Sequence, residues 1–179
     1  MNYMQKYVFL DRDGTVIVEG HYLHRPEDVE LETGVIEGLK RLQQQGFELV
    51  IVSNQSGIGR GYFGRDAVEA VHERIAELLR AEGIEIRDFL FCPHTPEEGC
   101  RCRKPGTELL ERFAKQYPID LSNSWVVGDR LCDVQLARNF NLNPVWIQNQ
   151  RHPDEIPKCM ELADVVANSF EEAAQEILG

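Results

Sequence analysis

Short apolar runs alternate along the chain with stretches in which apolar residues recur every three or four positions. The short runs predict buried strands at residues 7–10, 48–52, 89–91, 125–127, 145–147 and 165–166. The recurring pattern predicts helices at residues 35–45, 68–82 and 134–140, one opened by Pro105, and a last one capped by Ser169 and Glu172.

The alternation of strands and helices predicts an α/β fold. Because the strands are apolar on both faces, we expect a mainly parallel sheet covered by helices on either side. The 179 residues contain no linker, repeat or low-complexity tract, so they predict one domain spanning residues 1–179. In such a sheet, ligands bind beyond the carboxyl ends of the strands.

Charge and composition narrow the class of partner. The formal net charge of -11 argues against nucleic acid or an anionic membrane as the main partner. The apolar run at residues 7–10 is too short for a signal peptide or a membrane span, so we expect a cytoplasmic protein, with a monomer as the default state. The five cysteines are then thiols or metal ligands rather than disulfides.

Two strand ends carry paired carboxylates. Asp11 and Asp13 follow the first strand, and their spacing projects both to one side, where they repel each other unless a cation such as Mg²⁺ lies between them. Asp129 follows the fourth strand and suits the same metal site. Asp133, four residues further on, suits either an ion pair with Lys104 or a helix cap. Read alone, the residues from Asp11 to Thr15 also suit a simple turn.

Two other strand ends carry groups that suit an anion. Ser53 opens a polar loop whose hydroxyl and backbone N–H groups can hold a phosphoryl oxygen. Arg103 and Lys104 stand just before the helix expected at Pro105, whose N-terminus would add to an anion site. Ordinary solvated loops are the alternative for both segments.

Taken in order, Asp-x-Asp-Gly-Thr, Ser, Lys and Gly-Asp-x-x-x-Asp resemble the haloacid dehalogenase-like phosphatase superfamily. The resemblance implies a Rossmann-like sheet and a phosphatase that forms an aspartyl-phosphate. It implies that Asp11 is the nucleophile and Asp13 the acid and base, while Ser53 and Lys104 hold the phosphoryl group. It further implies Mg²⁺ on Asp11, Asp129 and the backbone carbonyl of Asp13.

A cysteine–histidine loop precedes Arg103. Cys92, His94, Cys100 and Cys102 form a set of four soft ligands that fits a closed, structural Zn²⁺ site. Free thiols are the alternative. The loop leads directly into Arg103 and Lys104, so zinc would fix where those cations point. We expect Cys132 and Cys159 to be ordinary thiols and His72 to be structural, and His152 has no assigned role.

The zinc loop and the segments at residues 9–15 and 53–61 resemble one branch of the superfamily. This branch contains D-glycero-D-manno-heptose 1,7-bisphosphate 7-phosphatases and histidinol-phosphate phosphatase domains. The loop after Ser53 and residues 19–24 favour the heptose enzymes, which implies a small phosphorylated metabolite as substrate. The resemblance implies these substrate-binding residues: Glu19, Gly20, His21, Tyr22, Asn54, Gln55, Ser56, Arg60, Arg103 and Arg130.

Several functions remain open at this stage. Histidinol-phosphate phosphatase is the nearest alternative, and a phosphosugar mutase is disfavoured because no insertion is large enough for a cap that excludes water. A catalytically silent, zinc-stabilised binding module is the alternative from another class. Such a module would be expected to have lost one of Asp11, Asp13, Lys104 or Asp129, and all four are present.

Overall fold

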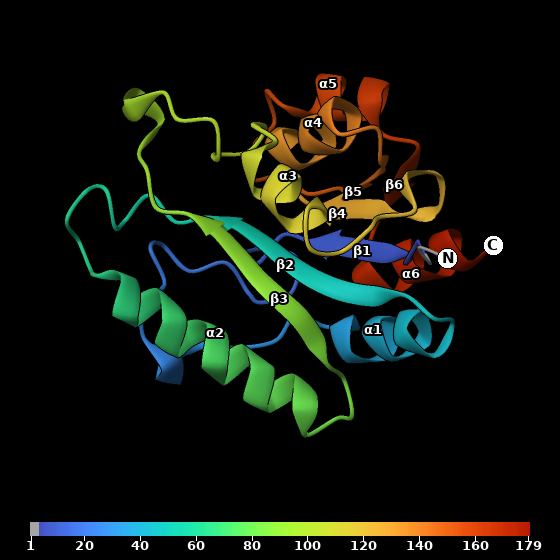
Figure 1. Cartoon of the computed structure of the whole chain (residues 1–179), viewed down its shortest axis with the longest axis horizontal. Helices are drawn as coiled ribbons and strands as arrows, with labels where there is room; N and C mark the ends of the chain where they lie inside the picture. Colours follow the sequence, from blue (N-terminus) through green and yellow to red (C-terminus); the bar gives the residue numbers. More distant parts are fainter. Residues whose placement is uncertain (1–3) are drawn as a thin grey trace.

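The computed structural model describes residues 4–179, which fold around one six-stranded parallel sheet with the strand order β3-β2-β1-β4-β5-β6 (Figure 1). The strands are β1 (Tyr7–Leu10), β2 (Glu48–Asn54), β3 (Ile86–Cys92), β4 (Trp125–Gly128), β5 (Asn143–Ile147) and β6 (Val165–Ala167). The helices are α1 (Val35–Gln44), α2 (Arg65–Arg80), α3 (Glu108–Ala114), α4 (Leu131–Asn139), α5 (Ile156–Leu162) and α6 (Phe170–Leu178), with 3-10 turns at Pro26–Asp28, Pro96–Glu98 and Leu121–Asn123.

Helices cover both faces of the sheet, as the apolar strands predict. Helices α1, α2 and α6 pack on one face, and α3, α4 and α5 pack on the other (Figure 1). Strand β1 shows the cause, because its side chains alternate between the two cores. Val8 and Leu10 lie in the core under α1 and α2, while Tyr7 and Phe9 lie in the core under α3.

The sheet topology creates one crevice. The chain runs outward from β1 through β2 to β3, then returns to β4 on the other side of β1 and continues to β6. The crevice between the carboxyl ends of β1 and β4 is the switch point at which such sheets bind ligands. Asp11 follows β1 and Asp129 follows β4, so both lie at this point.

Most predicted elements are confirmed, although several are longer than predicted. Strand β2 runs to Asn54, which places Ser53 within the strand rather than in the loop after it. The cap of α6 is confirmed in part: Ser169 accepts the Glu172 N–H, while the Glu172 carboxylate accepts the N–H of Asn168.

One predicted helix start is wrong. Helix α3 begins at Glu108, not at Pro105, because the chain first makes a turn in which the Gly106 N–H donates to the Arg103 carbonyl at 2.6 Å. Arg103 and Lys104 therefore do not lie directly beside a helix N-terminus. The position of Lys104 is fixed instead by its contacts with Asp11 and Asp133.

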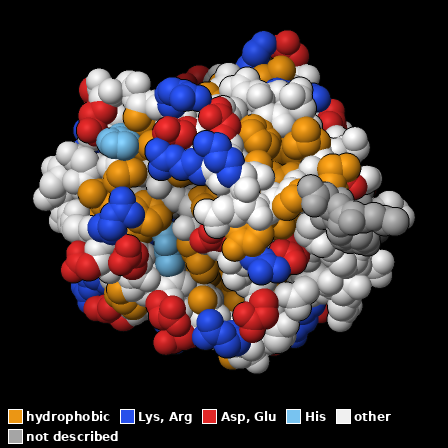
Figure 2. Space-filling model, in the orientation of Figure 1, with side chains coloured by type: hydrophobic (Ala, Val, Ile, Leu, Met, Phe, Trp, Pro, Cys, Tyr) orange, Lys and Arg blue, Asp and Glu red, His pale blue; other side chains and the backbone are white. Residues whose placement is uncertain are grey.

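Across residues 4–179, no helix of the protein combines the length and the apolar character needed to cross a membrane. Figure 2 shows acidic and basic side chains interspersed over one face of the molecule. None of the five cysteines, all of which are within the described residues, forms a disulfide.

Candidate active site

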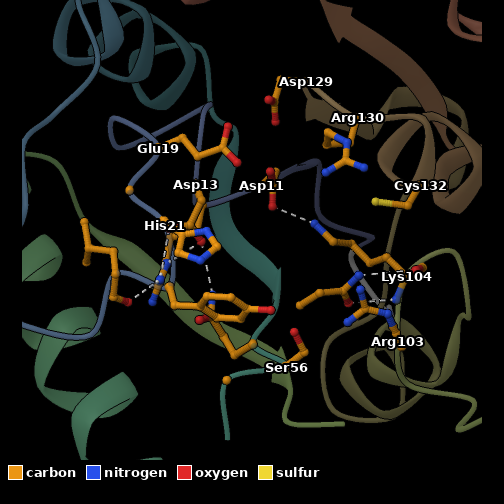
Figure 3. A pocket seen from close by; sticks show the side chains of 17 residues that line it. Asp11, Asp13, Glu19, His21, Ser56, Arg103, Lys104, Asp129, Arg130 and Cys132 are labelled. Carbon is orange, nitrogen blue, oxygen red and sulfur yellow. Dashed lines mark hydrogen bonds and ion pairs between the residues drawn. The ribbon is translucent and has the colours of Figure 1, made fainter. Parts of the chain in front are cut away.

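Most of the polar residues predicted at the strand ends line one pocket of about 400 Å³ (Figure 3), whereas Ser53 and Asp133 are not among its lining residues. Lys104, Arg103 and Arg130 lie on one side of it, and Asp13, Glu19 and His21 on the other. The lining residues are Asp11, Arg12, Asp13, Glu19, Gly20, His21, Tyr22, Leu23, Asn54, Gln55, Ser56, Gly57, Arg103, Lys104, Asp129, Arg130 and Cys132.

A buried lysine joins two carboxylates at the floor of the pocket. The Lys104 ammonium donates to Asp11 Oδ1 at 2.7 Å, to Asp133 Oδ1 at 2.6 Å and to the Val52 carbonyl at 2.7 Å. Burial by itself lowers the pKa of Lys104, but Asp11 and Asp133 together raise it above its ordinary value. The lysine is therefore a fixed positive charge beside Asp11.

Asp133 performs both of the roles left open for it. One oxygen accepts from Lys104, and the other accepts the backbone N–H of Arg130 at 3.1 Å, which caps the start of α4. The residue is 1% exposed, so these two contacts account for its carboxylate. Burial, and then the nearby Asp11, raise its pKa to about 6 against the opposing effect of Lys104.

Asp129 is a buried carboxylate whose charged form is disfavoured despite its ion pair with Arg151 at 2.8 Å. It lies close enough to Asp11 for one cation to bind both, since their oxygens and one of Asp133 fall within 4.8 Å of one another. Burial, followed by repulsion from Asp11 and Asp133, raises the pKa of Asp129 to about 9. Gly14, with φ of 84°, permits this approach, because a Cβ there would lie 2.6 Å from Asp129 Oδ2.

These carboxylates fit a hard divalent cation. Carboxylate oxygens are the ligands that Mg²⁺ prefers. A bound cation would stabilise the charged form of Asp129, which burial and the neighbouring carboxylates disfavour. Asp133 is already satisfied by Lys104 and the Arg130 N–H, so Asp11 and Asp129 are the side chains with oxygens to offer. The predicted pairing of these two residues at one site is thus present.

The two residues at the end of β2, Ser53 and Asn54, have different surroundings. The Ser53 hydroxyl is buried and has no hydrogen-bond partner among the described residues, so it can bind a ligand oxygen without giving up an existing bond. Asn54 instead supports Lys104: its Oδ1 accepts the Lys104 N–H at 2.9 Å, and its Nδ2 donates to the Lys104 carbonyl at 3.3 Å.

Asp13 is held by its neighbours rather than by Lys104. Arg12 donates to both of its oxygens, at 2.9 and 3.0 Å, and Gln55 donates to Oδ2 at 3.1 Å. Its side chain is 25% exposed, whereas that of Arg12 is 1% exposed. Asp13 therefore faces the pocket in a fixed orientation and remains open to water.

All of the predicted substrate-binding residues except Arg60 line the pocket, and one of them, Arg130, is engaged by another residue. Arg60 lies outside the lining of the pocket, 3.9 Å from Glu97. Arg130 lines the pocket, but its guanidinium forms a bidentate ion pair with Glu155 at 2.7 and 3.0 Å. Arg103 lines the pocket, and the only hydrogen bond of its guanidinium among the described residues is a long one, at 3.4 Å, to the His94 carbonyl.

Three residues at the site were not predicted from the sequence. Arg12 orients Asp13, and Arg151 bridges Asp129 and Glu19 at 2.8 Å each. Cys132 was expected to be an ordinary thiol, and it lines the pocket. Burial raises the pKa of this thiol, which keeps it neutral. Of these three residues, only Arg12 could have been found from the sequence, because it stands between the predicted catalytic residues Asp11 and Asp13.

The four predicted zinc ligands converge on one point. The sulfur atoms of Cys92, Cys100 and Cys102 are 3.1–3.6 Å apart, and His94 Nδ1 lies 3.2 Å from Cys102 and 3.5 Å from Cys92. Tetrahedral Zn²⁺ with Zn–S bonds near 2.3 Å places its sulfurs about 3.8 Å apart, so the three sulfur atoms would need to move only slightly apart to bind the ion. The cluster is compatible with a closed zinc site.

Comparison with known proteins places this site in a family. The family described as polynucleotide kinase 3 phosphatase matches residues 6–152. The D-glycero-beta-D-manno-heptose-1,7-bisphosphate 7-phosphatase of Pseudomonas aeruginosa is 32% identical over 172 residues, which cover 96% of this chain and 97% of that protein. The histidine biosynthesis bifunctional protein HisB of Legionella pneumophila is 41% identical over 142 residues, covering 78% of this chain but only 40% of that protein.

A solved structure agrees over the whole chain. The crystal structure of D,D-heptose 1.7-bisphosphate phosphatase from B. bronchiseptica, complexed with magnesium and phosphate, superposes with a TM-score of 0.87 at 29% identity and covers 97% of this chain and 98% of that one. Sequence, fold and strand-end residues therefore agree. The chain belongs to the polynucleotide kinase 3 phosphatase family within the haloacid dehalogenase-like phosphatase superfamily, in the branch that includes the heptose bisphosphate phosphatases, and it is a phosphatase.

Proposed function

We propose that this phosphatase removes the 7-phosphate of D-glycero-D-manno-heptose 1,7-bisphosphate. The observation that carries the proposal is the pocket itself, which combines a complete phosphoryl-transfer centre with a further free cation, Arg103, at its wall. A bisphosphate carries a second anionic group that needs such a cation. Relatives named as heptose bisphosphate phosphatases match nearly the full chain.

In this mechanism Asp11 attacks the phosphorus and forms an aspartyl-phosphate. Asp13 protonates the departing C7 oxygen, then takes a proton from the water that attacks the phosphorus of the intermediate, which releases inorganic phosphate and restores Asp11. The bonds from Arg12 and Gln55 orient Asp13 for both transfers. Its partial exposure admits the water.

The transferring group is held mainly by charge and by hydrogen bonds. Lys104 and the unpartnered Ser53 hydroxyl bind the phosphoryl oxygens. Asp11, Asp129 and the backbone carbonyl of Asp13 would hold Mg²⁺, which would supply neutralising charge at the phosphoryl group. These cations, with Arg103, create a locally positive pocket in a chain whose formal net charge is -11.

The zinc in this proposal is structural. Cys92, His94, Cys100 and Cys102 would fill all four positions of a tetrahedral ion, which would leave no position for a substrate. Arg103 follows Cys102 directly and contacts the His94 carbonyl, so the metal fixes the cation that we assign to the second phosphate.

Histidinol phosphate is the second candidate substrate, because HisB proteins are as similar in sequence as the heptose enzymes. Its imidazole would suit the wall formed by Glu19, His21 and Tyr22. This chain, however, spans about 40% of the length of those bifunctional proteins, and the free Arg103 favours a second phosphate.

Phosphate release from the two substrates, with Mg²⁺ and with both heptose anomers, tests the proposal. We expect kcat/KM for the heptose bisphosphate to exceed that for histidinol phosphate at least about a hundredfold, which corresponds to about 2.7 kcal/mol. The Arg103→Met variant should remove most of this preference. A preference for histidinol phosphate would reject the heptose assignment and leave the phosphatase chemistry unchanged.

A further inference from the structure

Two loops contribute residues to the wall of the pocket, and a third loop supports one of them without lining the pocket itself. Residues 92–102 form the metal loop, residues 55–64 the middle loop and residues 19–25 the substrate loop. The middle loop is fixed to the metal loop by two backbone bonds: the Gln55 N–H donates to the Cys92 carbonyl at 2.8 Å, and the Gly59 N–H donates to the Pro93 carbonyl at 2.9 Å. The middle loop is therefore anchored on its outer side.

The substrate loop has a conformation that its backbone alone does not favour. Tyr22 adopts φ of 52°, in the left-handed region that side chains other than glycine seldom occupy. Its backbone is tied locally by the Leu23 N–H to the Gly20 carbonyl at 3.2 Å, and by a contact of 2.8 Å between His24 Nδ1 and the Tyr22 carbonyl. Contacts from outside the loop must complete its support.

Two aromatic pairs connect the substrate loop to the middle loop. Tyr22 meets Tyr62 edge to face, with ring centroids 4.9 Å apart and planes at 88°. His24 stacks on Phe63 at 4.9 Å with planes at 12°. Both geometries are favourable for aromatic rings. We name these four residues the aromatic clasp.

The clasp has a fixed base and an exposed tip. Phe63 lies against Gly57, where a Cβ would be 2.1 Å from its ring, so any larger residue there would displace the ring. Tyr62 is 60% exposed and does not line the pocket, although Tyr22 does. Tyr62 is thus not part of the hydrophobic core, and it is not placed to contact a ligand in the pocket directly.

We propose that Tyr62 and Phe63 are positioning residues that hold the substrate loop against the pocket, and thereby set the affinity for the sugar part of the substrate. The proposal rests on the proposed function for the identity of that substrate. Phosphoryl transfer depends on Asp11, Asp13 and Lys104, none of which the clasp contacts. Loss of the clasp therefore raises KM and leaves kcat unchanged.

The test compares Tyr62→Ala with Tyr62→Phe, which keeps the ring, and with Met160→Ala, which removes another exposed apolar side chain on α5. Kinetics are measured with heptose 1,7-bisphosphate and with acetyl phosphate, which has no sugar. Cleavage by chymotrypsin between Tyr22 and Leu23, followed by mass spectrometry, reports the loop without any substrate.

Tyr62→Ala is expected to raise KM for the heptose about 3- to 10-fold, the range of one aromatic pair, with kcat and acetyl phosphate turnover unchanged. Cleavage after Tyr22 should become faster in this variant only. Unchanged cleavage and KM, or a fall in kcat alone, would overturn the proposal. If the parent enzyme does not hydrolyse the heptose, the proposed substrate fails, and the cleavage rates still decide whether the clasp holds the loop.

Discussion

At the scale of single residues, the site depends on how three buried charges are shared. Lys104 is 4% exposed and forms ion pairs with both Asp11 and Asp133, and within residues 4–179 neither carboxylate has another cationic partner at ion-pair distance. In a buried cluster of this kind, loss of the one cation leaves two uncompensated negative charges. Lys104 is thus both a phosphate ligand in the proposed mechanism and a structural requirement.

The Lys104→Met variant should lose both stability and activity. We expect the free energy of unfolding to fall by about 3–5 kcal/mol and kcat to fall at least about a hundredfold. Lys40→Met is the matched control, because Lys40 forms a surface pair with Glu82 whose loss should cost less than about 1 kcal/mol. Urea unfolding and phosphate release measure the two effects. A destabilisation no larger than that of the control would contradict the assigned role.

The site residues that could be predicted from the sequence differ from those that could not in whether a local sequence pattern marks them. Asp11, Ser53 and Asp129 were predictable because each follows or ends an apolar run, where parallel sheets bring polar groups together. Lys104 lies well beyond the end of β3 at Cys92, and its signal was the pair of cations directly before Pro105. Arg151 lies beyond a strand end without a recognisable motif, and only the folded loop brings it to Asp129. The pairing of Arg130 with Glu155 depends on how α5 packs against α4, which no local pattern encodes.

At the scale of elements, the metal loop is the segment that owes least to an apolar core. Thr95 to Gly99 are polar or small apart from Pro96, and the only regular structure is a single 3-10 turn. The structure brings the four predicted ligands together, and whether they bind zinc stays a prediction. The sequence pointed to them because soft ligands clustered within eleven residues have few other uses in a protein without disulfides. It misplaced the following helix, since the turn at Gly106 delays its start.

Removal of zinc should therefore loosen the loop and Arg103 together. A chelator is expected to lower the melting temperature of the parent protein by several degrees and to raise KM for the bisphosphate more than KM for acetyl phosphate. Cys102→Ser should already be destabilised, contain less zinc by elemental analysis and respond little to chelator. A parent protein with no bound zinc after expression in zinc-supplemented medium would contradict the zinc assignment.

At the scale of the whole molecule, the strand order determines where function can lie. The sheet and its two helical layers could be predicted from alternating apolar patterns, and the crevice between β1 and β4 follows from the strand order. The packing of individual polar groups could not. His72, expected to be structural, is 5% exposed and stacks on Phe89 with ring centroids 4.8 Å apart.

The stability of the molecule should depend on pH through His72. Burial, and then the nearby Arg12, lower the pKa of His72 to about 3 from 6.5. The unfolded chain gains a proton below about pH 6.5 while the folded chain does not, so this contribution is complete above pH 6.5 and is lost as the pH falls toward 3. His72→Phe should reduce the loss of unfolding free energy between pH 6.5 and 5 by up to about 2 kcal/mol in urea titrations. An identical pH slope in both proteins would contradict this assignment.

The most direct test of the central claim is to trap the phosphorylated enzyme. The Asp13→Ala variant lacks the base that activates water, and acetyl phosphate needs no acid because its leaving group is a stable carboxylate. After rapid quenching in the presence of Mg²⁺, we predict that mass spectrometry finds one phosphoryl group on Asp11, and none in the Asp11→Asn, Asp13→Ala double variant. A phosphoryl group on another residue, or turnover by Asp11→Asn at the parent rate, would contradict the account.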